Sequence, residues 1–524
     1  MLKISDIKVD ITKDEDIKSH IAKKLRIPES DILKIEIVRK STDARKRSDI
    51  HFVYTVNAEF RDEKRILSFK NPCVSPAEEY VYSMPEGTAV FNNPPLIVGF
   101  GPAGMFASLL LSRLGANPVV IEQGEEIDAR TKSVYSFWSG GKPNPLSNVQ
   151  FGEGGAGTFS DGKLTTRIKD NRAVQVLKWL RDIGGAPEEI TYLAKPHIGT
   201  DKLKGVVKNI RQDIISNGGK ILFNTRLINL DIKNGAVCGA YTSAGYIKTE
   251  NIILAIGHSA RNTFNSLFES GVEMEQKPFA VGVRIEHLQK DINKVQYKTS
   301  EEEIALGAAD YKLTYKTSEG RGVYTFCMCP GGSVVAASSE EGGVVTNGMS
   351  FHSRSGENAN SALLVQIYPE DFEDSHPLSG MLFQRDLEQK AFAAGGKTYA
   401  APAQTVGSFL KGKKNEPEDV LPSYAPCVRY TNLDEFLPPF ICRALKETIP
   451  EMGRHLRGFD SDSAILTAIE SRSSCSVRIL RDNFGLSNIK GLYPAGEGAG
   501  YAGGIISSAV DGIFQAENVW KNNA

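Results

Sequence analysis

Three glycines that follow a short apolar run have the spacing of a dinucleotide-binding turn. Residues 96–98 are Leu-Ile-Val, and a strongly apolar segment with helical character comes directly after the glycines. In such a turn the first glycine permits a tight bend, the second lets the backbone approach a pyrophosphate, and the third lets the helix pack on the strand. The helix N-terminus then presents unpaired N–H groups to the anion. The turn is predicted to bind its cofactor through Gly99, Gly101, Pro102, Ala103 and Gly104.

An acidic residue follows at the distance that a ribose contact requires. Residues 117–121 form the next apolar strand, and Glu122 ends it, 18 residues after Gly104. A carboxylate at this place accepts hydrogen bonds from the ribose hydroxyls, and the adjacent Gln123 is expected to line the same site. Because a carboxylate would repel the additional phosphate of NADP, the pattern favours NAD or FAD.

Two further glycine-rich segments favour FAD over NAD. Residues 148–164 form a loop that can lie against a flat ring and a diphosphate, and residues 491–505 form a strand that ends in Gly-acid-Gly and leads into a helix. The acid can hold a ribityl chain, and the helix N-terminus would stabilise negative charge on a reduced flavin. Between them, residues 251–258 form a strand that returns to the cofactor. The predicted contacts in these segments are Gly154, Gly155, Ala156, Gly157, Thr158, Ser160, Asp161, Ala255, Gly257, Gly496, Glu497, Gly503, Gly504 and Ile505.

With these segments in this order, the chain resembles the FAD-dependent dehydrogenases of the two-dinucleotide-binding-domain flavoprotein superfamily. More narrowly, it is similar to the bacterial NAD(FAD)-utilising dehydrogenases. The resemblance covers most of the chain from Lys40 onward and includes residues 98–104, 148–164, 197–203, 326–332, 470–474 and 493–505. It implies FAD as the cofactor, Arg130 near the pyrophosphate, and a backbone contact from Leu227 to the adenine. Many superfamily members have Asp where this chain has Glu497, so the ribityl contact of Glu497 is less firmly implied.

An arginine among small residues is a candidate for substrate binding. Arg472 lies in Glu470-Ser-Arg-Ser-Ser-Cys475, and Glu470 shares its face at a period of two residues. Such an arginine can orient an anionic group beside a flavin, or it can be an ordinary solvated side chain on a strand. Arg354, which alternates with His352, is a second candidate for the same task.

Two other side chains are candidates for proton or electron transfer. His258 directly follows the Ala-x-Gly turn and is expected to face the cofactor as a general acid or base, unless it is a satisfied polar residue. Cys329, in the pair Cys327-x-Cys329, is either a redox-active thiol or an inert buried side chain. The chain has seven cysteines and no Cys-x-x-Cys pair, so no metal site is predicted.

The elements that position these residues predict an α/β protein with several domains. We expect a Rossmann-like FAD-binding domain in two parts, residues 91–276 and 456–524, with an inserted mixed α+β substrate domain at 277–455. Within the first part, residues 221–230 are predicted to form one strand that includes Leu227. Residues 1–90 form a small N-terminal α+β domain, ferredoxin-like, with strands at 2–11, 32–38 and 51–60 and a helix at 14–25.

The N-terminal domain carries a basic loop at residues 39–47. Residues 1–70 contain 17 lysines and arginines against 13 aspartates and glutamates, a local excess of four positive charges. The loop can bind RNA phosphates, which would make the chain a flavin-dependent RNA-modifying protein or a module with a structural flavin. The small excess and the lack of an aromatic platform favour docking to a protein partner or to the chain's own flavin domain instead, so nucleic acid is not expected as a partner.

The overall composition narrows the function further. With 41% hydrophobic and 24% charged residues, the composition excludes a largely disordered chain. The formal net charge of −1 excludes a global electrostatic attraction to nucleic acid or membranes. The charged N-terminus lacks a signal peptide, so a cytoplasmic location is expected.

A second glycine fingerprint is missing from the sequence. Electrons are therefore expected from a small-molecule substrate, from transiently bound NAD(P)H or from a redox partner protein. The sequence predicts an FAD-dependent oxidoreductase that transfers a hydride between flavin and a small anionic substrate.

Overall fold

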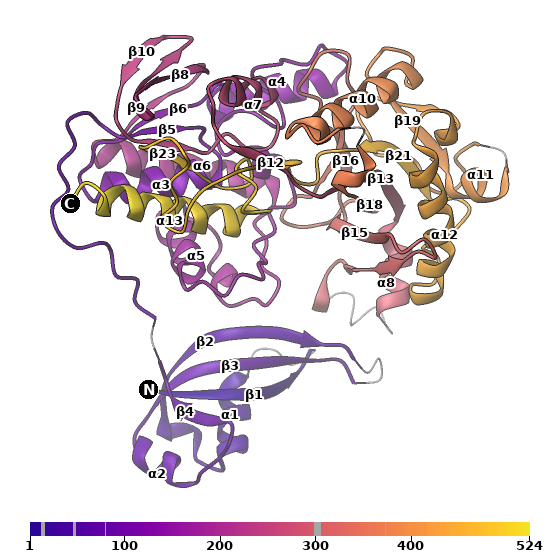
Figure 1. Ribbon diagram of the computed structural model, residues 1–524. Helices are drawn as coiled ribbons and strands as arrows, with labels where there is room; N and C mark the ends of the chain where they lie inside the picture. Colours follow the sequence, from indigo (N-terminus) through magenta and orange to yellow (C-terminus); the bar gives the residue numbers. More distant parts are fainter. Residues whose placement is uncertain (12–15, 46–48, 79, 298–304, 373, 414) are drawn as a thin grey trace.

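The computed structural model describes residues 1–524 except 12–15, 46–48, 79, 298–304, 373 and 414. It is a mixed α/β structure with three parts (Figure 1). A parallel sheet with its helices lies beside a larger mixed sheet, and the N-terminal sheet lies beneath both in this view.

The N-terminal part is one antiparallel sheet of order β2-β3-β1-β4 with two helices. Its elements are β1 (Leu2–Asp10), α1 (Ile17–Leu25), β2 (Ile32–Asp43), β3 (His51–Phe60), α2 (Glu63–Ser68) and β4 (Val74–Pro76). The predicted strand at 51–60 is confirmed, whereas β2 continues five residues beyond its predicted end because it pairs with β3 as far as Asp43. The predicted helix start at Asp14 lies outside the described residues.

The parallel sheet has the order β23-β11-β5-β6-β7. Its strands are β5 (Leu96–Val98), β6 (Val119–Ile121), β7 (Lys220–Leu222), β11 (Ile252–Leu254) and β23 (Leu492–Pro494). The central strands are continuous apolar runs because helices cover both faces of the sheet. These helices are α3 (Pro102–Arg113), α4 (Ile127–Trp138), α5 (Arg172–Asp182), α6 (Thr200–Ser216) and α13 (Ile505–Lys521). The glycine turns follow the carboxyl ends of the strands, where ligands bind to open α/β sheets.

The predicted strand at residues 221–230 is wrong, because the chain turns in its middle. Asn224 has a positive φ of 53°, and the Thr225 N–H donates to the Glu122 carbonyl at 2.8 Å. The second half, β8 (Leu227–Lys233), instead begins an antiparallel sheet with β9 (Ala236–Thr242) and β10 (Gly245–Lys248).

The large mixed sheet has seven strands in the order β14-β15-β18-β13-β21-β19-β20. They are β13 (Phe279–Leu288), β14 (Thr314–Lys316), β15 (Gly322–Cys329), β18 (Asn358–Ile367), β19 (Ala401–Thr405), β20 (Val428–Tyr430) and β21 (Ile465–Glu470). The predicted domain boundary at 455/456 is wrong, because β21 pairs with β13 and β19 in this sheet. The chain therefore leaves the inserted part after Glu470.

Smaller elements connect and cover the two large sheets. The helices are α7 (Arg261–Glu269), α8 (Gln289–Gln296), α10 (Ser379–Ala394), α11 (Val406–Lys411) and α12 (Pro439–His455). Strand β12 (Met274–Gln276) pairs with β22 (Val477–Ile479), and β16 (Ser333–Ala336) pairs with β17 (Thr346–Met349). Among the described residues, no helix combines the length and the apolar character that crossing a membrane requires.

The N-terminal sheet is joined to the rest of the chain through β2. The Lys40 N–H donates to the Tyr192 carbonyl at 2.8 Å, and the Ala194 N–H donates to the Lys40 carbonyl at 2.9 Å. Ala305 and Leu306 of the inserted part also pack against the N-terminal core. The basic segment at residues 39–47 thus begins on a strand that pairs with residues 192–194.

Candidate functional site

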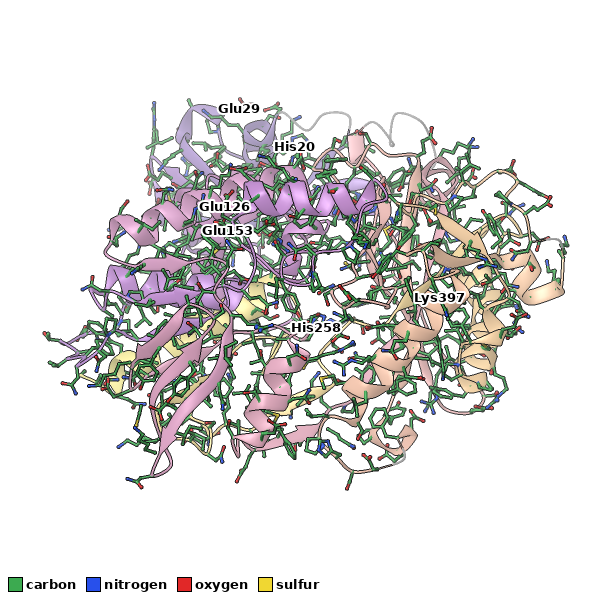
Figure 2. The ribbon with its side chains drawn as sticks, turned by 90° about the horizontal axis from the view of Figure 1, so that it is seen from above. His20, Glu29, Glu126, Glu153, His258 and Lys397 are labelled. Carbon is green, nitrogen blue, oxygen red and sulfur yellow. The ribbon has the colours of Figure 1, made fainter. Side chains whose placement is uncertain are left out.

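One cavity of about 1180 Å³ lies where the three parts meet. Its walls include the glycine turn at Gly99 and Gly101, the end of β21 at Glu470, and β2 at Lys40. In Figure 2, His258 is labelled near the middle of the molecule, between the parallel-sheet half and the inserted half. The cavity is larger than the roughly 300–1,000 Å³ that is usual for ligand sites, so it has room for a large cofactor and a second molecule.

The glycine turn is shaped by backbone contacts at two positions and by open space at the third. A Cβ on Gly99 would lie 2.4 Å from the Ala255 carbonyl oxygen, and one on Gly104 would lie 1.9 Å from the Gly99 carbonyl oxygen. A Cβ on Gly101 meets nothing nearer than 3.7 Å, at the Gly155 Cα. Gly99 and Gly104 are therefore required for strand, turn and helix to pack, whereas Gly101 leaves free room in the cavity, as a pyrophosphate site requires.

Glu122 organises the cavity wall beside this turn. One carboxylate oxygen accepts the Phe100 N–H at 2.8 Å, and the other accepts the Gly124 and Gly152 N–H groups at 2.9 and 3.0 Å. A carboxylate has about four acceptor positions, so three backbone bonds leave capacity for a ribose hydroxyl. The predicted cofactor residue thus also fixes the backbone around the site.

Two helix N-termini open on the same cavity. Helix α3 begins at Pro102, and α13 begins at Ile505 directly after the cavity-lining Gly503 and Gly504. Added Cβ atoms on these two glycines would meet nothing within 3.5 Å. Two helix N-termini with free space before them suit a ligand with more than one polar or anionic region.

His258 and Glu497 form a polar pair in the cavity wall. His258 Nδ1 lies 3.2 Å from a Glu497 carboxylate oxygen. The other ring nitrogen, Nε2, is buried and has no hydrogen-bond partner within the described part of the chain. A buried imidazole nitrogen requires a partner, and a bound cofactor would supply one. The free space beside Gly101 and the unpartnered Nε2 of His258 are both consistent with FAD bound in this cavity.

Most of the residues predicted from the sequence meet in this cavity. Those that line it are Gly99, Gly101, Pro102, Ala103, Glu122, Gln123, Gly155, Ala156, Gly157, Ser160, Leu227, Ala255, Gly257, His258, Arg354, Arg472, Glu497, Gly503, Gly504 and Ile505. Gly104, Arg130, Gly154, Thr158, Asp161, Gly496 and Cys329 are not among the lining residues. Of this second group, Arg130, Asp161 and Cys329 are fully buried behind the wall.

Arg130 is fully buried beneath the cofactor loop rather than exposed beside a pyrophosphate. Its guanidinium donates to the backbone carbonyls of Asn148, Val149 and Glu153 at 2.9, 3.0 and 2.6 Å. The implied pyrophosphate contact is therefore corrected: Arg130 holds the glycine-rich loop in place because its donors already satisfy three loop carbonyls.

The buried Asp161 forms an ion pair with the half-buried Arg354. The Arg354 guanidinium donates to both carboxylate oxygens of Asp161, at 3.0 and 2.6 Å. Burial raises the pKa of the Asp161 carboxyl, but the Arg354 hydrogen bond and charge outweigh it and keep the pKa below its usual value. Asp161, predicted as a cofactor contact, thus orients Arg354 at the cavity wall.

Arg472 is held by a network of buried charges. Its guanidinium donates to both oxygens of Glu388 at 2.9 and 2.8 Å and to the Ser339 hydroxyl. Arg261 donates to the same carboxylate from the other side, at 2.8 Å. Three of the five donors of Arg472 are thus directed to the protein, so its position is fixed while its edge still lines the cavity.

Two residues that line the cavity, Glu470 at the end of β21 and Cys327 near the end of β15, are not among the residues predicted from the sequence. Glu470 lines the cavity, and its burial raises the pKa of its carboxyl to about 7, although Arg284 donates to it at 3.2 Å. In the adjacent pair of cysteines, Cys327 lines the cavity and the predicted Cys329 lies fully buried behind it. The sequence does indicate Glu470, because it shares a face with Arg472 at a period of two residues. It does not indicate Cys327, because the bulge that exposes this residue is defined only by the pairing of β15 with β18.

The N-terminal part contributes a section of wall that no motif predicted. Lys40, Ser41, Thr42, Ala44 and Phe52 line the cavity, and the Lys40 ammonium lies 4.0 Å above the Phe52 ring. Within the described residues, no group of three or more histidines, cysteines and carboxylates is arranged to hold a metal ion.

Comparison with known proteins supports the cofactor. A family model described as "FAD-dependent protein, C-terminal domain-like" matches residues 278–473, and a model for a domain of unknown function matches residues 1–59. The first match confirms the FAD prediction.

One relative and two solved structures are similar to most of this chain. An uncharacterized protein of Clostridium beijerinckii is 48% identical over 524 residues, covering 99% of this chain and 98% of the relative. Glycine oxidase from Bacillus cereus is 11% identical, with a TM-score of 0.36 over 83% of this chain and 98% of its own. L-proline dehydrogenase from P. horikoshii is 13% identical, with a TM-score of 0.31 over 82% of this chain and 94% of its own. These structural similarities are too low to transfer either activity.

Proposed function

Since the chain belongs to the same family as the uncharacterized Clostridium beijerinckii protein, and since its residues 278–473 match the model "FAD-dependent protein, C-terminal domain-like", we propose that it is an FAD-dependent oxidoreductase. Its reaction would move a hydride between the flavin and a small anionic organic substrate. The narrower resemblance to NAD(FAD)-utilising dehydrogenases belongs to the same proposal.

The observation that carries this proposal is the continuity of one cavity. The glycine turn, the loop at 155–160 and the N-terminus of α13 supply the part that fits FAD, and β15, β21 and β2 supply a second wall with ionisable side chains. Bound FAD would supply a two-electron acceptor and donor in this space. A substrate between the two walls would lie within the same enclosure.

The charges of the wall favour an anionic substrate. Among the described lining residues, seven are lysine or arginine (Lys40, Lys163, Lys195, Arg226, Lys312, Arg354, Arg472) and four are acidic (Glu122, Asp310, Glu470, Glu497). A cavity with an excess of cations raises the local concentration of anions. Arg354 is the best placed to orient a carboxylate, because Asp161 fixes its guanidinium from behind.

Glu470 is proposed as the group that takes or gives the substrate proton. A general acid or base works best when its pKa lies near the working pH, and burial raises the pKa of Glu470 to about 7. Arg284 and the Thr346 hydroxyl hold the carboxylate, at 3.2 and 3.4 Å. His258 and Arg472 are proposed to orient cofactor and substrate instead, through their fixed contacts with Glu497 and Glu388.

The N-terminal domain is proposed to close the substrate end of the cavity. Its strand β2 docks beside Tyr192 and Ala194 and carries Lys40 into the wall. This use of the basic segment gives less support to RNA binding, because Lys40 is half-buried in the cavity wall and Arg45 donates to Asp43. Lys46 and Arg47 of the same loop lie outside the described residues. Electron supply by NAD(P)H or by a partner protein remains part of the proposal.

The experiment is an anaerobic screen of the purified holoprotein with small amino and hydroxy carboxylates, monitored by the visible absorption of the flavin. At least one anionic substrate should bleach the flavin, and its neutral amide should not. The variant Glu470→Gln should retain FAD and lose the ionisation near pH 7 from the pH profile of the rate. Equal reduction by anionic and neutral compounds, or an unchanged pH profile in Glu470→Gln, would contradict the proposed roles.

A further inference from the structure

The two cysteines of β15 lie at an irregularity in the strand. Phe326 pairs with Ala362, but Cys329 pairs with Asn360, so β15 has one extra residue relative to β18. Cys327 within this bulge has a positive φ of 42°. Positive φ is uncommon for residues other than glycine, and bulges re-aim side chains, often next to active sites. Here the bulge turns Cys327 toward the cavity, where its side chain is half-buried.

The second cysteine lies directly behind the first. The Cys329 thiol is fully buried and donates to the Cys327 carbonyl at 3.2 Å, and both cysteines are free thiols in the structure. Because the Cys329 Sγ lies only 3.2 Å from the Cys327 carbonyl oxygen, the two residues are within reach of a disulfide bond, which spans a Cα separation of about 4.4–6.8 Å. The pair can therefore close a disulfide with little movement of the backbone.

The surroundings give the two thiols different tasks. Arg284 is fully buried, donates to the Cys327 carbonyl at 2.9 Å and lies 3.9 Å from the Cys329 sulfur, and Lys163 lines the same cavity. A hydrogen bond from the Cys329 thiol lowers the pKa of Cys327, helped by Lys163 and Arg284 and opposed by burial and Asp161. That same hydrogen bond, together with burial, raises the pKa of Cys329. The accessible Cys327 thiol is thus the attacking nucleophile, and the buried Cys329 thiol is the resolving cysteine.

We propose that Cys327 and Cys329 form a redox-active dithiol that exchanges two electrons with a small disulfide entering the cavity. The Cys327 thiolate attacks one sulfur of the external disulfide, whose S–S bond breaks, and the first small thiol leaves with a proton. Cys329 then attacks the Cys327 sulfur, the mixed disulfide breaks, and the second small thiol leaves with the second proton. The protein gains an internal disulfide and loses two electrons and two protons, which the two released thiols contain.

The test is a redox titration of the purified holoprotein in mixtures of reduced and oxidised glutathione, followed by rapid alkylation and peptide mass analysis. Cleavage after lysine and arginine leaves both cysteines on the single peptide of residues 322–354. This peptide should change from doubly alkylated to an unalkylated form that lacks two hydrogen atoms as the mixture becomes more oxidising. The exposed Cys427 is on another peptide and does not affect the readout.

Two variants separate the roles of the thiols. Cys329→Ser should accumulate one glutathione on Cys327, because no second thiol is present to release it, whereas Cys327→Ser should accumulate none on this peptide. Cys442→Ser, which removes a buried thiol elsewhere, should titrate like the wild type. A peptide that stays fully alkylated in the most oxidising mixture, or Cys329→Ser that takes up no glutathione, would overturn the proposal. Because the readout is a peptide mass, it is independent of whether the flavin reaction proposed above takes place.

Discussion

The guanidinium of Arg284, in the middle of β13, lies 3.2 Å from the carboxylate of Glu470 at the end of the neighbouring strand β21, and both side chains are buried. Arg284 also donates to the Asn360 side chain at 2.9 Å and to the Cys327 carbonyl. One cation thus stabilises both the carboxylate and the thiol that face the cavity. Although Arg284 lowers the pKa of Glu470, burial has the larger effect, so the carboxyl keeps its proton to about pH 7.

The first prediction concerns the stability of the fold as a function of pH. The unfolded chain releases the Glu470 proton near pH 4.5, whereas the folded chain holds it to about pH 7. The native state therefore binds more protons in this window, and stability falls as the pH rises through it. The contribution of Glu470 is about 3 kcal/mol over the window. Glu470→Gln should reduce the fall in the free energy of unfolding between pH 5 and pH 7; an unchanged slope would contradict the assignment.

The second prediction concerns the room at Gly101. Gly101→Val should abolish FAD binding, because the side chain would occupy the place of the pyrophosphate, while the fold should persist because the added Cβ meets no protein atom within 3.5 Å. Gly205→Val is the matched control, since Gly205 lies on α6 with nothing within 4 Å of an added Cβ. The measurements are flavin content and thermal unfolding. A Gly101→Val protein that retains FAD would show that the cofactor lies elsewhere.

The third prediction concerns Glu122. Glu122→Ala should weaken FAD binding by about 1–3 kcal/mol, the scale of a lost hydrogen bond to a charged group. It should also destabilise the protein without FAD, because the Phe100, Gly124 and Gly152 N–H groups lose their acceptor. Glu122→Gln, which keeps one carbonyl acceptor, should lose less of both. Titration of the FAD-free protein gives the affinity, and its unfolding midpoint gives the stability. Unchanged affinity in Glu122→Ala would exclude the ribose contact.

The fourth prediction concerns nicotinamide cofactors. The chain has one complete glycine fingerprint, at Gly99–Gly104, and it is assigned to FAD. NADH and NADPH, if they reduce the flavin, should therefore do so only at high concentration and without saturating at low micromolar levels. An anaerobic titration monitored by the visible absorption of the flavin decides this point. Tight, stoichiometric reduction by either cofactor would require a nicotinamide site that the glycine pattern does not provide.

The cofactor half of the site was predictable because its requirements are local. Gly99 needs a positive φ of 98°, and Gly104 must touch the strand, so both appear in the sequence as glycines at fixed spacing. The strand–turn–helix order around them follows from the apolar pattern. The resemblance alone could not place Arg130, because an arginine near a phosphate-binding loop can donate to loop carbonyls as well as to a phosphate, and only the fold decides between them.

The substrate half was less predictable because it depends on contacts between distant segments. Strand β21 reads as part of the returning flavin domain, but its partners β13 and β19 lie about 180 and 60 residues earlier, and only their pairing assigns it to the large sheet. Cys327 faces the cavity through a bulge that is defined against β18. Lys40 lies in the cavity wall only because β2 pairs with residues 192–194, and no local sequence pattern predicts that pairing.

The most direct test of the account is the flavin content of the purified protein. The protein should be yellow, and denaturation should release close to one FAD per chain, identified by mass. A protein that is purified colourless and takes up no FAD when the cofactor is added would contradict the assignment of the cavity, and with it the proposed oxidoreductase.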